Sequence, residues 1–230
     1  MQKRQKLSLM KAIILAAGKG ERFGDITKSI PKPLIKLGQL SLIEHNIVLL
    51  KEYGYKDIVI NVSYLHDAII DFLGNGDKYN IKIKYSIEVP EPYETGGGIK
   101  HALSLLGNQP FLVINSDIYT DFRLSNIVLG QKDLASLVMV RNPNHNVRGD
   151  FSISKGRVIL KEKNDLTYSG ISILDPKIFK NFRDHKFKLI DVFMEQIKND
   201  AVSGQVHDGA WIDIGTPDRL KTAEDLFIND

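Results

Sequence analysis

Two segments near the start of the chain combine glycine with cationic side chains in a pattern that suits a polyphosphate. An apolar run leads directly into the loop Ala16–Arg22, which contains Gly18 and Gly20. Glycine lets the backbone approach phosphate oxygens closely, because it has no side chain and tolerates positive φ angles. Arg22 adds a planar guanidinium group, and Lys32, which lies between two prolines, adds the compact charge of an ammonium group. The sequence therefore predicts a nucleoside triphosphate as ligand, with a tight turn that binds nothing as the alternative.

Two aspartates are candidate metal ligands. Asp117 follows the apolar run Phe111–Ile114, and Asp213 lies beside Trp211 and Ile214. A carboxylate next to a buried strand is unfavourable unless it is paired or binds a metal. Two carboxylates without histidine or cysteine partners favour a hard ion such as Mg²⁺, with phosphates completing its shell. The alternative is that each aspartate serves only a turn or a helix cap.

A second glycine patch, Glu94–Ile99, precedes an expected helix. Free backbone amides there, together with the helix dipole, would suit an anion or the edge of a base, whereas a flexible loop is the simpler interpretation. The first glycine loop matches neither the Gly-x-Gly-x-x-Gly nor the Walker pattern, so the dinucleotide and P-loop fingerprints both fail.

Composition limits the possible partners. The 230 residues carry a net charge of only +3, contain no cysteine, and are 43% hydrophobic and 26% charged. A chain of this length and composition is typical of one α/β domain. Scattered lysines at low net charge favour neither a nucleic-acid nor a membrane partner. No apolar run approaches the roughly 20 residues of a transmembrane helix. We expect a cytoplasmic protein that acts on small molecules.

The apolar pattern of the first half predicts alternating strands and helices, which is typical of a parallel sheet covered on both faces. A capping box at Ser41–Glu44 is expected to open a helix that ends near Gly54. Further strands are expected at 57–62, 81–88 and 111–114, and further helices at 65–73 and 97–106. Ligands bind beyond the carboxyl ends of such strands. The segments 18–22, 88–98 and 115–117 should therefore share one crevice.

The second half is less regular. Its expected strands lie at 134–140, 168–174 and 201–207, with a hairpin at 151–161 and helices near 176–182 and 189–199. Thr216 followed by Pro217 predicts the cap and first residue of a last helix.

These motifs resemble those of the sugar-1-phosphate nucleotidylyltransferases, over almost the whole chain. The likeness is carried by Leu15–Arg22, Pro31–Leu34, Asn115–Asp117 and Trp211–Thr216. Within that family, three further segments are most similar to the uridylyltransferases of N-acetylmuramate α-1-phosphate. They are Glu94–Ile99, Arg148–Phe151 and Ser169–Ile171.

The resemblance implies a single-domain, Rossmann-like α/β fold with a mixed, mostly parallel sheet, helices on both faces and a small sugar-binding lobe. Residues of about 10–120 would form the nucleotide-binding half and 121–228 the half with the sugar site and the second metal ligand, after an N-terminal extension at 1–9. The implied substrates are UTP and the sugar 1-phosphate, and the implied cofactor is Mg²⁺. A monomer or a small homo-oligomer is expected.

Carried over position by position, the resemblance implies three groups of site residues. The nucleotide would contact Ala16, Ala17, Gly18, Gly20, Glu21, Arg22, Lys32 and Gly97, and Arg22 and Lys32 would also be catalytic. The sugar phosphate would contact Asn115, Gly149, Asp150, Glu162 and Ser169. Asp117 and Asp213 would hold Mg²⁺.

Two departures from the family pattern leave alternatives open. Phe23-Gly24-Asp25 replaces a hydrophobic residue and a proline-containing stretch, and Glu162-Lys163 is a pair that the muramate-type enzymes often lack. The same chemistry with GTP and a mannose or heptose 1-phosphate is the first alternative. A glycosyltransferase is a second, although Asn115-Ser116-Asp117 is not an Asp-x-Asp pair. A sensor that binds nucleotide sugars without turnover is a third.

Overall fold

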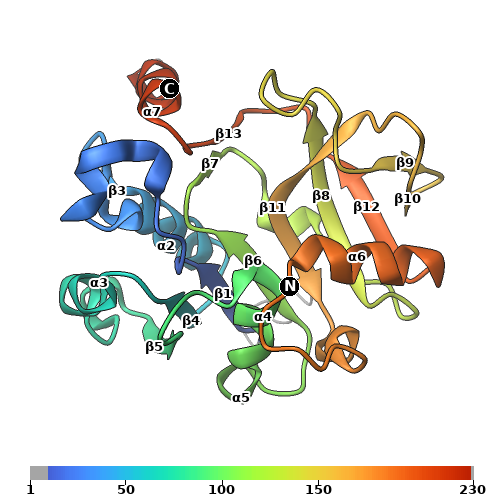
Figure 1. Cartoon of the computed structure of the whole chain (residues 1–230), viewed down its shortest axis with the longest axis horizontal. Coiled ribbons are helices and arrows are strands. Elements are labelled where there is room, and N and C mark those ends of the chain that lie inside the picture. The colour runs from blue at the N-terminus through green and yellow to red at the C-terminus, as the bar shows by residue number, and fades with distance from the viewer. Residues whose placement is uncertain (1–9, 229–230) are drawn as a thin grey trace.

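The computed structural model describes residues 10–228, so the expected extension at 1–9 lies outside the described part (Figure 1). The strands are β1 (Ala12–Leu15), β2 (Lys36–Leu37), β3 (Leu40–Ser41), β4 (Asp57–Val62), β5 (Lys82–Ile87), β6 (Phe111–Asn115), β7 (Ile118–Thr120), β8 (Ala135–Arg141), β9 (Ser152–Ser154), β10 (Arg157–Ile159), β11 (Leu166–Leu174), β12 (Val202–Val206) and β13 (Trp211–Asp213). The α-helices are α2 (Leu42–Glu52), α3 (His66–Leu73), α4 (Glu94–His101), α5 (Leu103–Leu106), α6 (Leu189–Lys198) and α7 (Pro217–Ile228). The 3₁₀ helices are η1 (Glu21–Lys28), η2 (Lys32–Leu34), η3 (Asp77–Tyr79), η4 (Leu124–Asn126) and η5 (Pro176–Phe179).

The main sheet has nine strands in the order β5-β4-β1-β6-β11-β8-β12-β10-β9. Only β10 and β11 run against the direction of the others, which confirms the expected mixed, mostly parallel sheet. Leu15 at the end of β1 stands opposite Asn61 on β4 and Asn115 on β6. The carboxyl ends of these three strands therefore meet at one edge.

Helices cover both faces of the sheet (Figure 1). Side chains of β1 alternate between two cores, because successive residues of a strand point to opposite faces. Ala12 and Ile14 pack in one core with α2 and α3, whereas Ile13 packs in the other with α4, α5 and α6. None of the helices in the range 10–228 is long and apolar enough to cross a membrane.

A third, smaller core joins segments that are far apart in the sequence. Phe23 from η1, Leu37 from β2 and Ile212 and Ile214 around β13 are buried together with residues of α2 and α7. In the two-stranded sheet formed by β13 and β7, Asp213 stands opposite Ile118. This core places the second predicted metal ligand next to the segment that carries the first.

The helix predicted at 97–106 begins earlier and is divided at Ala102 into α4 and α5. The expected free amides at Gly96 and Gly97 are wrong, because both N–H groups donate to the carbonyl of Phe187, at 3.0 and 3.1 Å. A side chain on Gly96 would meet the Phe187 ring, and one on Gly97 would collide with the His185 carbonyl. This glycine patch is therefore a docking face for the segment before α6.

Smaller differences lie at the ends of elements. The expected helix near 176–182 is the short 3₁₀ helix η5, and β11 begins at Leu166 instead of Tyr168. The predicted helix boundaries are confirmed elsewhere: the capping box of α2 is formed by Ser41 and Glu44, and the Thr216 hydroxyl accepts a hydrogen bond from the Arg219 N–H at 3.4 Å.

Candidate active site

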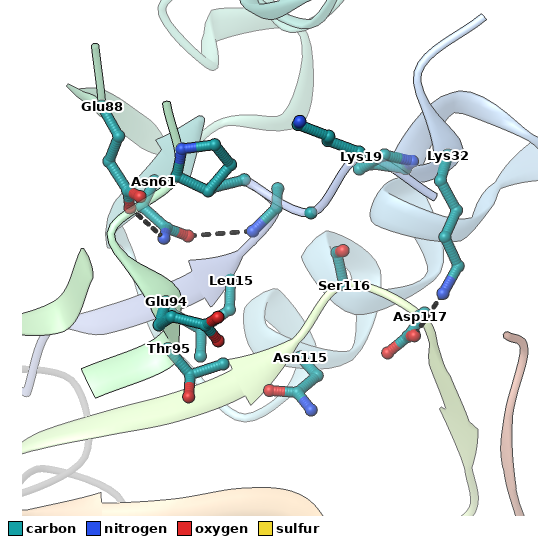
Figure 2. A pocket seen from close by; sticks show the side chains of 15 residues that line it. Leu15, Lys19, Lys32, Asn61, Glu88, Glu94, Thr95, Asn115, Ser116 and Asp117 are labelled. Atoms are coloured by element: carbon teal, nitrogen blue, oxygen red, sulfur yellow. Dashed lines mark hydrogen bonds and ion pairs between the residues drawn. The ribbon is translucent and has the colours of Figure 1, made fainter. Parts of the chain in front are cut away.

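A cavity of about 350 Å³ lies at the edge where β1, β4, β5 and β6 end (Figure 2). The sequence-predicted residues that line it are Ala16, Ala17, Gly18, Lys32, Asn115 and Asp117. Glu88 and Thr95, from the segment 88–98 that was expected in this crevice, also line the wall, together with Asn61, which the sequence had not singled out. The expected crevice beyond the strand ends is thereby confirmed, since the loop after β1 and the turn after β6 face the same space.

Lys32 ties the two halves of this cavity together. Its Nζ forms an ion pair with Asp117 Oδ2, and the two side chains are only 12% and 22% exposed. Gly20 adopts φ +70°, and a Cβ there would lie 2.8 Å from Cβ of Lys32. The backbone of Gly20 thus packs directly against the aliphatic part of the Lys32 side chain. Any other residue at position 20 would collide with Lys32 and would also be strained at this positive φ angle. The glycine loop and the segment that carries Lys32 are thus brought to one place.

Asn46, which no motif in the sequence marks, holds the turn that carries Asp117. It lies on α2 and is buried, and its Nδ2 donates to the carbonyls of Ser116 and Ile118, at 3.2 and 3.4 Å. A buried amide must find partners because leaving it unpaired is unfavourable. A polar residue on the apolar face of a predicted helix was the available signal.

A buried chain of hydrogen bonds runs along the opposite wall (Figure 2). Glu88, only 1% exposed, accepts from Asn61 Nδ2 at 2.7 Å and from the Tyr93 N–H at 2.6 Å. Asn61 Oδ1 in turn accepts from the Ala16 N–H at 2.9 Å. Burial raises the pKa of Glu88, and these hydrogen bonds lower it by a smaller amount. A side chain on Gly98 would collide with the Glu88 carboxylate, so this glycine makes room for it.

Replacing Glu88 by glutamine is expected to alter the pH dependence of stability. The pKa of Glu88 is raised above 4.5 in the folded protein, so the folded state binds more protons than the unfolded chain and the parent loses stability as pH rises through that window. Glutamine does not titrate. The free energy of unfolding, measured in urea between about pH 4.5 and 8, should therefore rise for the variant relative to the parent as pH increases. Parallel curves of unfolding free energy against pH for the parent and the variant would contradict this prediction. The control is Glu52→Gln, since Glu52 is exposed.

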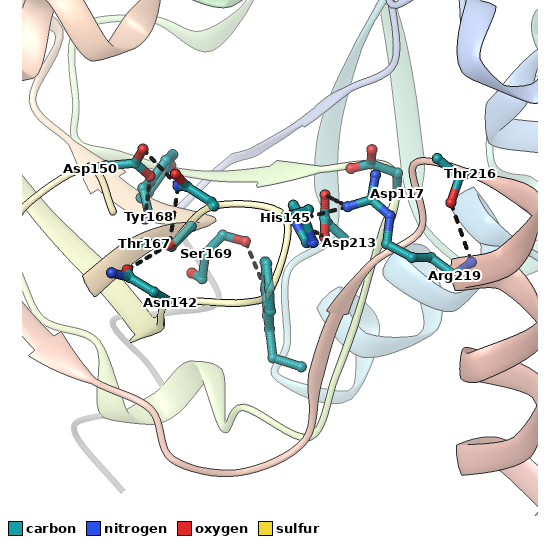
Figure 3. A network of polar contacts seen from close by, with 12 residues as sticks. Asp117, Asn142, His145, Asp150, Thr167, Tyr168, Ser169, Asp213, Thr216 and Arg219 are labelled. Atoms are coloured by element: carbon teal, nitrogen blue, oxygen red, sulfur yellow. Dashed lines mark hydrogen bonds and ion pairs between the residues drawn. The ribbon is translucent and has the colours of Figure 1, made fainter. Parts of the chain in front are cut away.

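Asp213 occupies a second cluster of polar contacts (Figure 3). Its Oδ2 accepts from Arg219 Nη1 at 2.6 Å, and its Oδ1 lies 3.1 Å from His145 Nε2. Arg219 Nη1 also donates to that imidazole nitrogen, at 2.9 Å. With Nε2 accepting from arginine, the imidazole has no proton there to give to Asp213. Asp213 Oδ1 is accordingly buried without a hydrogen-bond partner among the described residues.

The two aspartates fit a magnesium ion that is bound together with phosphate. Asp213 Oδ1 is a buried oxygen without a hydrogen bond in the described part of the chain, and Asp117 lies next to the β7 residue that faces Asp213. Within residues 10–228, no three His, Cys, Asp or Glu side chains gather into a metal site. Mg²⁺ commonly takes one or two carboxylates and completes its shell with water and substrate phosphates.

The predicted sugar-binding residues lie mainly on β11 and the loop before β9 (Figure 3). Asp150 accepts from Asn146 Nδ2 at 3.0 Å and from the Tyr168 N–H at 2.8 Å, which ties that loop to β11. Ser169 is buried, and its hydroxyl accepts from the Ile171 N–H at 3.2 Å. Gly149 adopts φ +63° in the same loop, and Glu162 is exposed after β10. Their contact with a sugar stays a prediction.

The remaining predicted nucleotide contacts, Glu21, Arg22 and Gly97, do not line this cavity. Glu21 and Arg22 are exposed at the start of η1, whereas Gly97 is buried in α4. A Cβ on Gly215, just after β13, would lie 2.8 Å from Arg22 Nη2. The guanidinium of Arg22 therefore reaches from the glycine loop to the strand that carries Asp213.

A parallel-strand edge with a glycine loop, a partly buried lysine and two aspartates around neighbouring strands is typical of a nucleotide-binding α/β protein of the phosphate-transferring type. Residues 11–229 match the family model described as nucleotidyl transferase. The chain belongs to this nucleotidyl transferase family.

Individual relatives agree with this membership. The chain is 42% identical over 226 residues to N-acetylmuramate alpha-1-phosphate uridylyltransferase of Neisseria meningitidis serogroup B, which covers 94% of this chain and 98% of that protein. It is 31% identical over 216 residues to D-glycero-alpha-D-manno-heptose 1-phosphate guanylyltransferase of Campylobacter jejuni, covering 91% and 96%. The crystal structure of HddC from Yersinia pseudotuberculosis complexed with GMP-PN superposes with a TM-score of 0.77 at 25% identity, covering 95% and 100%. The resemblance to sugar-1-phosphate nucleotidylyltransferases is confirmed.

Proposed function

We propose that the protein transfers UMP from UTP to N-acetylmuramate α-1-phosphate and releases UDP-N-acetylmuramate and pyrophosphate. This reaction returns a cell-wall sugar to its nucleotide-activated form, and we place it in the cytoplasm. The observation that carries the proposal is the 42% identity to the Neisseria uridylyltransferase across nearly the full length of both chains. The cavity beside Lys32 and Asp117 supports it, because it offers cations and carboxylates at one parallel-strand edge.

The chemistry needs no protein nucleophile. A sugar phosphate is mostly dianionic at neutral pH, since its second pKa is about 6. One of its oxygens forms a bond to the α-phosphorus of UTP, and the bond from that phosphorus to the bridging oxygen of the β-phosphate breaks. The electron pair leaves with pyrophosphate. We assign the neutralisation of the leaving group to Arg22 and Lys32, and the alignment of the two anions to the strand ends. The proximity of Arg22 to Gly215 and of Lys32 to Asp117 supports this assignment.

We propose that Asp117 and Asp213 hold Mg²⁺ together with the phosphates. When bound, the ion supplies charge neutralisation at the phosphoryl oxygens. Lys32 must then share or leave the Asp117 carboxylate, which frees its Nζ for a phosphate oxygen.

The second candidate is a guanylyltransferase that acts on a heptose or mannose 1-phosphate. The Campylobacter relative supports it, since its identity of 31% extends over 91% of this chain. Both candidates share the cavity and the mechanism and differ in base and sugar.

Pyrophosphate release from a panel of substrates tests the proposal. UTP or GTP is combined with Mg²⁺ and the 1-phosphates of N-acetylmuramate, N-acetylglucosamine, mannose or heptose. UTP with the muramate should exceed the other pairs by about 10²-fold in kcat/KM, the discrimination that a difference of one substituent commonly gives. Preference for GTP with heptose or mannose would select the second candidate, and activity that survives EDTA would contradict the magnesium role.

A further inference from the structure

Two arginines from distant segments converge on one glycine. The Nη2 atoms of Arg22 and Arg219 both lie within 3.0 Å of the point where a Cβ of Gly215 would stand. The two like charges are therefore within about 6 Å of each other. Gly215 is buried, so the missing side chain leaves the space that both guanidinium groups share. Two cations this close are favoured when an anion joins them, because charge-assisted hydrogen bonds to one anion offset their repulsion.

Arg219 already has a partner, and that partner is a proposed metal ligand. Its Nη1 donates to Asp213 Oδ2, and its side chain is only 15% exposed. A metal ion on the unpartnered Oδ1 and the arginine on Oδ2 would repel each other across one carboxylate, so metal binding at Asp213 weakens the hold on Arg219.

The backbone around Arg219 is fixed, whereas its side chain has alternatives within reach. Its N–H donates to the Thr216 hydroxyl in the first turn of α7, at 3.4 Å. The guanidinium is a planar fork that matches a carboxylate and a phosphate equally well. Rotation of the side chain alone can therefore move the guanidinium from Asp213 further into the space that it shares with Arg22 beside Gly215.

We propose that Arg219 is a second phosphate-binding arginine, and that it exchanges partners during the reaction. In the free protein it holds and screens the Asp213 carboxylate. In the presence of metal and pyrophosphate it releases that carboxylate and pairs, beside Arg22, with the phosphate oxygens of the leaving group. This inference rests on the proposed function, since it takes Asp213 as a metal ligand.

The variant Arg219→Gln tests the exchange in two binding experiments, both measured by calorimetry. Mg²⁺ alone should bind the variant about threefold more tightly than the parent, because Asp213 has lost its competing cation. Pyrophosphate with Mg²⁺ should bind about 10-fold more weakly, because a charge-assisted hydrogen bond is lost. A purely structural role would weaken both. Unchanged or weaker Mg²⁺ binding, or unchanged pyrophosphate binding, overturns the proposal.

Three further variants sharpen the experiment. Lys221→Gln removes one charge from the exposed side of α7 and should change neither affinity. Arg219→Lys keeps the charge without the fork, and it should recover part of the pyrophosphate affinity even if the glutamine variant folds poorly. Asp213→Asn should weaken the binding of Mg²⁺ alone by about 10-fold, because one of its two carboxylate ligands is lost. If that binding is unchanged, the metal role of Asp213 fails and the exchange fails with it. If it is weakened while Arg219→Gln binds Mg²⁺ no more tightly, only the exchange fails.

Discussion

Replacing Lys32 by alanine is expected to lower kcat/KM for pyrophosphate release by about 10²–10³-fold, the loss typical of removing one group that stabilises charge in the transition state. Lys32 lies at the junction of the glycine loop and the Asp117 turn and is 12% exposed. A cation held in such a sheltered place acts more strongly on phosphate than one in bulk water. The measurement is steady-state pyrophosphate release at saturating Mg²⁺.

Two controls separate chemistry from folding. Lys51→Ala removes an exposed lysine from α2 and should leave kcat/KM unchanged. The unfolding transition of Lys32→Ala should remain cooperative, because the buried cores lie on either side of the sheet and do not include this side chain. A kcat/KM within threefold of the parent would show that Lys32 has no catalytic role.

The sheet edge was predictable because it depends on local patterns. Apolar runs of strand length end at polar or glycine residues after β1 and β6, and parallel strands bring such ends together. Gly20, Lys32, Asn115 and Asp117 converge there. Nothing beyond apolar periodicity and turn residues was needed for this part of the site.

The partners of the site residues were not predictable, because they depend on tertiary packing. Asn61 and Glu88 look like ordinary strand-end residues, yet burial joins them to the Ala16 N–H. The glycine patch was expected to lead into a helix that begins at Gly97, but the helix begins at Glu94, and the segment at Phe187 needs the space that side chains on the glycines would fill. In each case the deciding contact comes from a residue at least 27 positions away.

Arg219 shows the same limit for charged groups. In the sequence it is one of several polar residues in the first turns of a terminal helix, where exposure to solvent is the usual outcome. The buried cluster around Ile212 and Ile214 brings α7 against β13, and this contact sets the guanidinium against Asp213. The ion pair between Arg219 and Asp213 thus depends on the packing of the third, smaller core.

Replacing Asp117 by alanine is expected to have an effect at least as large, about 10³-fold in kcat/KM, because it removes a metal ligand and also the partner that orients Lys32. Added Mg²⁺ should not restore kcat, since the missing oxygen cannot be replaced by raising the concentration of the ion. Asp213→Asn should behave differently and mainly shift the Mg²⁺ concentration needed for half-maximal rate, because Asp117 remains. The measurement is the rate as a function of Mg²⁺ for the parent and both variants.

A double-mutant cycle shows which part of the Asp117 effect belongs to the ion pair. In the free protein the Lys32–Asp117 pair is partly buried, so its coupling should lie between the values of surface and buried pairs, at about 1–2 kcal/mol in unfolding free energy. The single variants should each lose stability, and the double variant should lose less than the two together. In activity the cycle should be non-additive as well, because either change disables the same phosphate-binding corner. An Asp117→Ala variant that keeps the parent's kcat and Mg²⁺ response would contradict both the ion's location and the role of this turn.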